Sequence, residues 1–231
     1  MNIKKAGILF IIYLLLFYSE VFSAPCYGTK MPQRKHIFIG FQTHDIIKRK
    51  LEKNYGKLRS LQYFFLLSYG LTDWFSIDLK IGEGYIKEHP VGSDEIDYPS
   101  SFAGGYGFRI KLLDNERNQT RIVFGFQHIS VHPYTVHVNE VKHQAVLDDW
   151  QASLIVSKRI KAFTPYMGIK LSRVDYIHWI NENRKRDMSD LTKTVGLVTG
   201  IDIPFFIGSW LNIEAQFLDG KAGSFAVMYP F

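Results

Sequence analysis

The feature of this sequence that most limits its fold is a period of two, which returns in short segments from residue 36 to the end. The segment 74–82 is typical, because the apolar residues Phe75, Ile77, Leu79 and Ile81 alternate with Ser76, Asp78, Lys80 and Gly82. Such alternation gives a β-strand one apolar face and one polar face. A mean hydropathy of -0.07 excludes a bundle of apolar membrane helices, but it does not exclude a set of amphipathic strands. The sequence therefore predicts an all-β chain.

Ten candidate strands follow from this period. They are His36–Thr43, Ser60–Tyr69, Trp74–Gly82, Ser101–Leu112, Thr120–Val131, Leu147–Lys158, Phe163–Asp175, Leu191–Ile203, Trp210–Phe217 and Ala222–Phe231. Segments of about eight to twelve residues are long enough to cross a bilayer at a tilt of about 45°. Because the signal of each strand is weak, any count from about eight to twelve strands stays open.

The connections between these strands alternate in length. The short ones are Gly70–Asp73, Leu113–Gln119, Arg159–Ala162 and Pro204–Ser209, and the long polar ones are His44–Arg59, Glu83–Ser100, His132–Val146 and Tyr176–Asp190. Barrels of the bacterial outer membrane alternate in this way, with tight periplasmic turns and longer outward loops. Because hydrocarbon tolerates no unpaired backbone, the sheet must close on itself. We predict a closed antiparallel transmembrane up-and-down β-barrel over residues 36–231.

The first 23 residues have the pattern of a secretory signal peptide. Lys4 and Lys5 precede an apolar run from Ile8 to Tyr18, and Ser23 ends a stretch that a signal peptidase would accept. That run is too short to cross a bilayer. We therefore expect cleavage after Ser23 and a short N-terminal periplasmic segment over residues 24–35. The single cysteine, Cys26, cannot form an internal disulfide and lacks the sequence context of a lipidation site.

Charged residues occur within several strands, in the phase opposite to the apolar residues. They are Asp78, Lys80, Arg109, Lys111, Lys170, Asp202 and Glu214. In a membrane barrel this phase points into the lumen, where charges of mixed sign are most simply ion pairs that fill it. Asp78 or Lys80 is expected to face Arg109 or Lys111 across neighbouring strands. The alternative is a charged path for conduction.

Aromatic residues gather at the strand ends next to the short turns. We expect them to form the periplasmic aromatic girdle, with Tyr69, Trp74, Phe75, Phe163, Tyr166, Phe205, Phe206, Trp210, Tyr229 and Phe231. Trp150, Tyr176 and Trp179 would supply the outer girdle.

The C-terminal stretch has a terminal Phe231, an aromatic Tyr229 two positions before it, and apolar Phe225 and Val227 in the same phase. It resembles the β-signal of small bacterial outer-membrane β-barrel proteins, although Pro230 departs from the usual pattern. The strand–turn–strand phrase Tyr69–Ile77 is also similar to phrases in these barrels. The resemblance implies a location in the bacterial outer membrane and recognition by the barrel assembly machinery. It implies no activity.

One group of residues resembles a catalytic motif. His128 and Ser130 are similar to the His-x-Ser signature of lipid A deacylases, with Glu140 downstream as a candidate carboxylate. The family's Asn after the Ser is replaced here by Val131. By the strand phase His128 points outward, where a lipid substrate would lie. The pairs Asp148–Asp149 and Asp175–His178 resemble those of ten-stranded outer-membrane proteases, but their spacing does not match.

The remaining polar groups favour no cofactor. His128, His132, His137 and His143 crowd one region, but their spacing fixes no metal geometry, and we expect neither a metal nor a cofactor. The formal charge of +6 is spread over loops rather than along a nucleic-acid stripe. Two loops are basic and suit contact with lipopolysaccharide phosphates, with Lys48, Arg49, Lys50, Lys53, Lys57 and Arg59 in one and Arg184, Lys185 and Arg186 in the other.

The sequence thus predicts a barrel with a structural, surface-interaction or narrow-passage role and a lumen filled by side chains. A lipid-modifying enzyme and a small-solute pore remain the alternatives.

Overall fold

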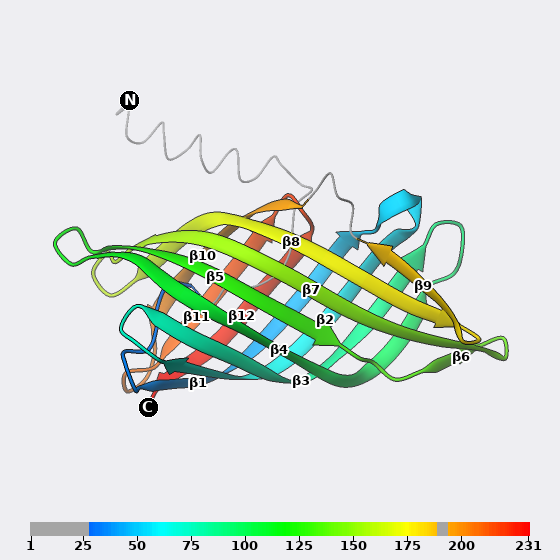
Figure 1. Cartoon of the computed structure of the whole chain (residues 1–231), viewed down its shortest axis with the longest axis horizontal. Helices are drawn as coiled ribbons and strands as arrows, with labels where there is room; N and C mark the ends of the chain where they lie inside the picture. The colour runs from blue at the N-terminus through cyan, green and yellow to red at the C-terminus, as the bar shows by residue number, and fades with distance from the viewer. Residues whose placement is uncertain (1–27, 189–193) are drawn as a thin grey trace, which may run out of the picture.

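The computed structural model describes residues 28–188 and 194–231, which form an antiparallel barrel (Figure 1). Its wall consists of β1 (Ile37–Lys50), β2 (Gly56–Gly70), β3 (Phe75–Pro90), β4 (Ile96–Asn115), β5 (Thr120–Val131), β7 (Val141–Lys158), β8 (Thr164–Ile180), β10 (Val195–Pro204), β11 (Trp210–Phe217) and β12 (Lys221–Pro230). Two shorter strands, β6 (Val136–Val138) and β9 (Asn183–Met188), pair with β7 and β8. The expected signal peptide, Cys26 and the start of the predicted strand Leu191–Ile203 lie outside the described residues.

The wall closes between its first and last strands. β1 pairs with β12 in antiparallel register, so that Ile39 faces Tyr229 and Phe41 faces Val227. Every other pair joins strands that follow one another around the wall, and β7 pairs with both β5 and β8. No wall strand therefore has an open edge, as a lipid environment requires. The prediction of a closed up-and-down barrel with ten wall strands is confirmed.

The outer face of the wall carries an apolar belt. Its large side chains are exposed on every wall strand except β5, where the outward residues are half-buried, and they include Phe41, Phe65, Ile77, Leu79, Ile81, Phe102, Tyr106, Leu154, Val156, Met167, Ile169, Leu171, Leu197, Ile213 and Phe225. In water, so large a contiguous apolar surface would drive aggregation, whereas hydrocarbon is its natural solvent. These residues belong to the alternating set that the sequence predicted to face lipid.

No helix in the described part of the chain is long and apolar enough to cross a membrane.

The strands are longer than the sequence predicted. The expected loop His44–Arg59 is mostly the ends of β1 and β2, which leave a connection of only a few residues around the short 3-10 helix η1 (Glu52–Asn54). The expected loop Glu83–Ser100 is likewise mostly β3 and β4, and β4 reaches 20 residues. The long polar connections are therefore arms of strand that continue the barrel past the apolar belt.

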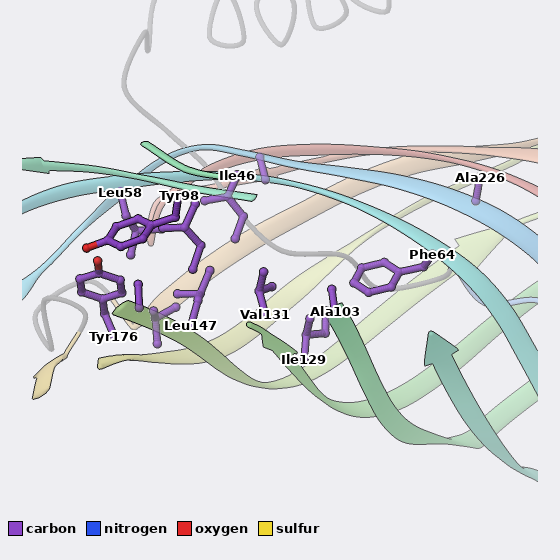
Figure 2. Close-up of a cluster of buried hydrophobic side chains, with 14 of the residues drawn as sticks. Ile46, Leu58, Phe64, Tyr98, Ala103, Ile129, Val131, Leu147, Tyr176 and Ala226 are labelled. Atoms are coloured by element: carbon purple, nitrogen blue, oxygen red, sulfur yellow. The ribbon is translucent and has the colours of Figure 1, made fainter. Parts of the chain in front are cut away.

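Inside these arms lies a hydrophobic cluster. Ile46, Leu58, Ile86, Tyr98 and Leu147 are almost completely buried there, and each points inward from a different strand. Figure 2 shows Leu58, Tyr98, Leu147 and Tyr176 gathered at one end of this cluster. The outer face therefore reverses its polarity along the barrel, from apolar in the belt to charged on the arms. The inside is mixed, with Phe64 and Leu66 buried in the belt and Glu88 and His178 buried beside the apolar residues of the arms.

The aromatic girdle is partly as expected. Exposed rings at the turn end of the barrel include Trp74, Phe163, Phe205, Phe206, Tyr229 and Phe231. Tyr166 and Trp210 were wrongly assigned to it, because their strand phase points them into the lumen, where both are buried. Of the outer set, Trp150 is exposed, but Tyr176 also points inward and is fully buried.

Candidate functional site

The lumen at the turn end of the barrel is organised around Arg109. Its Nε and Nη2 donate to the two carboxylate oxygens of Asp78 at 2.8 and 2.7 Å, and both side chains are buried. Such a two-pronged contact fixes the plane of both groups. The sequence expected Asp78 or Lys80 to face Arg109 or Lys111, and the structure brings Asp78 and Arg109 together. The guanidinium also donates to the Ser68 hydroxyl at 3.2 Å.

The N-terminal residues enter this mouth of the barrel. Arg109 Nη1 donates to the carbonyl oxygen of Lys30 at 2.5 Å, and the Thr29 hydroxyl donates to Ser157 at 2.5 Å. The ammonium group of Lys30 lies 4.5 Å from the centre of the Trp210 ring. Burial lowers the pKa of Lys30 from its ordinary value, and the nearby carboxylate of Asp202 opposes that shift. The described part of the expected periplasmic segment thus packs against lumen side chains.

Asp202 and Glu214 belong to a second buried group. Tyr166 donates its hydroxyl proton to Glu214 Oε2 at 2.7 Å. The amide of Asn212 donates both to the Tyr166 oxygen at 2.9 Å and to Asp202 Oδ1 at 2.8 Å. Two carboxylates are thereby joined through the neutral donors Tyr166 and Asn212. Tyr166 is the residue of this group that the sequence reading misplaced.

The middle of the lumen holds two cations around one carboxylate. Lys170 Nζ lies 2.8 Å from Asp219 Oδ2, and Arg49 Nη1 lies 2.6 Å from the same oxygen. All three residues are buried, with Arg49 and Lys170 each 1% exposed. Lys170 is where the sequence placed it. Arg49 was wrongly assigned to a loop, and Asp219 was not singled out, because it lies in the turn between β11 and β12.

The two other predicted lumen lysines differ in their surroundings. Lys80 is buried and donates to the Gln42 side-chain oxygen at 2.9 Å. Lys111 lies near the rim and pairs with Asp114 at 2.9 Å, with about a fifth of its side chain exposed. Lys111 is therefore part of the rim and not of the buried network.

Towards the outer end, three tyrosines surround Glu88. Tyr55 donates to one carboxylate oxygen at 2.6 Å, and Tyr176 and Tyr98 donate to the other at 2.5 and 3.1 Å. His178 stacks against the ring of Tyr176 and lies within 3.0 Å of the Tyr55 hydroxyl. The sequence reading placed Glu88 in the long polar connection Glu83–Ser100. The structure buries it, because β3 continues through that loop.

The candidate catalytic residues lie on the outer face, at the outer limit of the apolar belt. The Ser130 hydroxyl donates to Asp148 Oδ1 at 2.5 Å, and His132 Nε2 is 2.8 Å from the same hydroxyl oxygen. His128 stacks on Trp150 with ring centres 3.9 Å apart, and its Nε2 lies 3.4 Å from Asp148. The structure thus brings together His128 and Ser130 with a carboxylate from β7.

That carboxylate is not the one expected. Glu140 sits at positive φ in the turn between β6 and β7, and Asp148 takes the place that it was assigned beside Ser130. In the described chain, no three His, Cys, Asp or Glu side chains converge as metal ligands. The protease-like residues are divided between faces, since Asp149 and His178 are buried in the lumen, whereas Asp175, which is also buried, lies on the opposite face and binds Arg186.

The predicted assembly signal forms the outer face of the closing strand. Phe225, Tyr229 and Phe231 are exposed, and the residue pairs Thr43–Phe225, Phe41–Val227 and Ile39–Tyr229 join β12 to β1. These side chains therefore lie on the seam at which the barrel closes.

A closed antiparallel wall, an apolar outer belt and a polar buried lumen together define an outer-membrane β-barrel protein. The chain is located in the bacterial outer membrane, with its belt in the hydrocarbon.

Solved barrels of the same general kind resemble the structure. An outer-membrane channel from Pseudomonas putida F1 matches with a TM-score of 0.47 and 11% identity, covering 90% of this chain and 100% of that one. OprG from Pseudomonas aeruginosa and the attachment invasion locus protein Ail of Yersinia pestis both match with a TM-score of 0.42 and 10% identity. They cover 88% and 87% of this chain, and 99% and 100% of their own. No protein-family model and no curated relative matches the chain.

Proposed function

We propose that this protein is a sealed barrel that conducts no solutes and acts through its outer surface. The observation that carries the proposal is the ion-paired group at mid-lumen, in which Arg49 and Lys170 share the carboxylate of Asp219. Charges buried this deeply are costly unless they are paired, so they are held together rather than left along an open path.

Two further layers support a sealed lumen. On the turn side, Arg109 holds Asp78 and the backbone of the N-terminal segment. On the outer side, the hydrophobic cluster fills the arms, and an apolar constriction opposes the passage of ions. A solute would have to displace all three layers in turn.

Planar-bilayer recording of the purified protein tests this proposal. We expect no steady single-channel steps at a protein concentration at which a reference porin gives them. Regular steps of uniform size would refute the sealed lumen and establish a narrow passage or pore.

The outer surface is where a sealed barrel can act. Its apolar belt contacts lipid, its basic arms suit the phosphates of lipopolysaccharide, and the exposed aromatic face of β12 suits recognition by the barrel assembly machinery. These partners are part of the proposal and call for no nucleic acid and no cofactor.

A second candidate function is hydrolysis of a lipid ester, as in a lipid A deacylase. One observation favours it, namely the Ser130 hydroxyl between Asp148 and His132 on the lipid-facing side. A base within reach of a serine hydroxyl is the first requirement of a nucleophile.

Mass spectrometry of lipid A separates the two functions. Cells that express the wild-type protein are compared with cells that express Ser130→Ala, and Thr43→Ala provides a control hydroxyl on β1. We expect identical acylation in all three. A loss of acyl chains that requires Ser130 but not Thr43 would establish the enzyme.

A further inference from the structure

The outer rim carries a row of like charges on neighbouring strands. On the hairpin of β1 and β2, Lys50 stands directly opposite Lys57, and Lys57 is in turn opposite His89 on β3. On the other side of β1, Lys48 is opposite Lys221 of β12. Like charges that face each other across a sheet are destabilising. The sequence therefore keeps an unfavourable arrangement in which three neighbouring strands, β12, β1 and β2, present lysines to one region.

Nearby acidic groups do not neutralise the lysines of this hairpin. Glu95 is engaged by Arg59 at 3.1 Å and by His89 at 2.6 Å, and Asp97 binds Lys87. Within the described chain, Lys48, Lys50, Lys53 and Lys57 form no ion pair. Conflicts of this kind between local charge and fold are concentrated at functional sites.

A cavity of about 780 Å³ lies between the tips of the two hairpins. Lys48, Lys50, Lys53 and Lys57 line it, and Glu52 is the only acidic side chain among its lining residues. Four lysines and one glutamate therefore line one open space. Strongly hydrated ammonium groups in this arrangement suit an anion with several charged oxygens.

The backbone that holds the cavity is well anchored. Leu51 N donates to Gly56 O at 3.0 Å, and Val91 N donates to Tyr55 O at 3.0 Å, which joins the two hairpins. The Tyr55 hydroxyl reaches into the barrel and donates to Glu88 at 2.6 Å. The lysine side chains thus extend from a fixed frame and do not need an ordered loop to form on binding.

The height of the cavity indicates the class of anion. Asp45, the first charged outward residue of β1, marks the limit of the apolar belt, and Lys50 lies five residues beyond it. At about 3.3 Å per residue and a tilt of about 45°, this is roughly 12 Å above the belt. That depth corresponds to sugar head groups and not to acyl chains.

We propose that this cavity binds a phosphorylated saccharide of outer-leaflet lipopolysaccharide. The phosphate oxygens accept hydrogen bonds from Lys50 and Lys57 and relieve their mutual repulsion. The inference deepens the proposed surface function by giving it a site and a ligand class.

The test measures binding of fluorescently labelled rough lipopolysaccharide to the full mature protein in detergent micelles. The double variant Lys50→Gln, Lys57→Gln is compared with Arg117→Gln, Lys158→Gln, which removes two exposed positive charges at the turn end. We expect the first variant to bind about fivefold more weakly, because two exposed charge contacts that contribute about two- to threefold each multiply to about this factor. The control should bind as the wild type does. Chemically dephosphorylated lipopolysaccharide should bind the wild type as weakly as intact lipopolysaccharide binds the double variant.

The unfolding temperature provides a second measurement, because a variant that binds more weakly should be more stable without ligand. Without lipopolysaccharide, Lys57→Gln should raise the unfolding temperature by about 1–3 °C, because it removes one of two facing charges. When intact lipopolysaccharide is added, the unfolding temperature of the wild type should rise by more than that of the variant.

Three results would overturn the inference. They are equal affinity of the wild type and the double variant, equal binding of intact and dephosphorylated lipopolysaccharide, and binding of inorganic phosphate alone as tightly as lipopolysaccharide. The last result would assign the cavity to free phosphate. None of these results bears on conduction, and a conducting barrel would refute the sealed lumen while leaving the binding data unchanged.

Discussion

Replacing Asp219 by Asn isolates the energetic role of the mid-lumen charges. The substitution preserves shape but leaves Lys170 and Arg49, both almost inaccessible to solvent, without the carboxylate that they share. Breaking a buried ion pair from one side costs about 3–5 kcal/mol. Asp149 moderates this loss of stability. The Ser172 hydroxyl donates to the Asp149 carboxylate, and the Ser172 backbone carbonyl oxygen accepts from Arg49, so a second carboxylate is linked to the same charged group. We therefore expect a loss near the lower end, about 3 kcal/mol.

The assay is reversible denaturant unfolding of the barrel in lipid vesicles, followed by tryptophan fluorescence and by the shift in gel mobility that accompanies unfolding. Asp97→Asn is the matched control, because its ion pair with Lys87 is solvent-exposed and contributes about 1 kcal/mol or less. Adding Lys170→Met to Asp219→Asn should recover part of the loss, since one unpaired cation is then removed. If Asp219→Asn and Asp97→Asn have equal effects, the mid-lumen pairing does not contribute to stability and the reasoning fails.

Two other substitutions test the lipid face and the seam. Phe41→Arg places a charge in the apolar belt and should cost about 2–4 kcal/mol in vesicle unfolding, whereas Lys57→Arg at the rim should cost close to nothing. A negligible loss for Phe41→Arg would mean that this face does not meet hydrocarbon. Phe231→Ala removes an exposed ring and should lower the amount of folded barrel in cell membranes while leaving refolding into vesicles unchanged. Equal losses in both experiments would point to a structural role and not to recognition during assembly.

Much of the barrel could be predicted from the sequence because a lipid-facing strand has one simple requirement. Outward residues such as Ile77, Leu79 and Ile81 must be apolar, so the alternation of apolar and polar residues is visible in the sequence. The same phase places Asp78 inside and opposite β4, where Arg109 is within reach. The turn Leu71–Trp74 is equally local, since the Thr72 hydroxyl accepts from Phe75 N at 2.9 Å.

The lengths of the strands could not be predicted in this way. Past the belt, the apolar residues of a strand face inward and its charged residues face outward. On β2, Tyr63 and Phe65 point outward, whereas Leu58 points inward and Lys57 and Arg59 point outward. A reading that follows one apolar phase finds the alternation broken at this point and assigns a loop. Arg49 and Glu88 were misplaced for the same reason, since each lies inside an arm of strand that the sequence reading treated as solvent-exposed. A change of apolar phase flanked by charges is the signal that would have located these arms.

The change in polarity of the outer face also gives the belt and the arms different roles. In the belt, stability depends on the lipid outside and on paired charges inside, so the lumen there is polar and would conduct if its pairs were opened. In the arms, water is outside, and Ile86 and Tyr98 pack inside as in a soluble barrel. The outer face of the arms is thereby freed from any role in packing. Lys50 and Lys57 can stand opposite each other there, at a small cost in stability that the interior of the arms easily offsets. A membrane barrel that ended at the lipid surface would have no such face, and this is why the anion site lies on the arms and not on the belt.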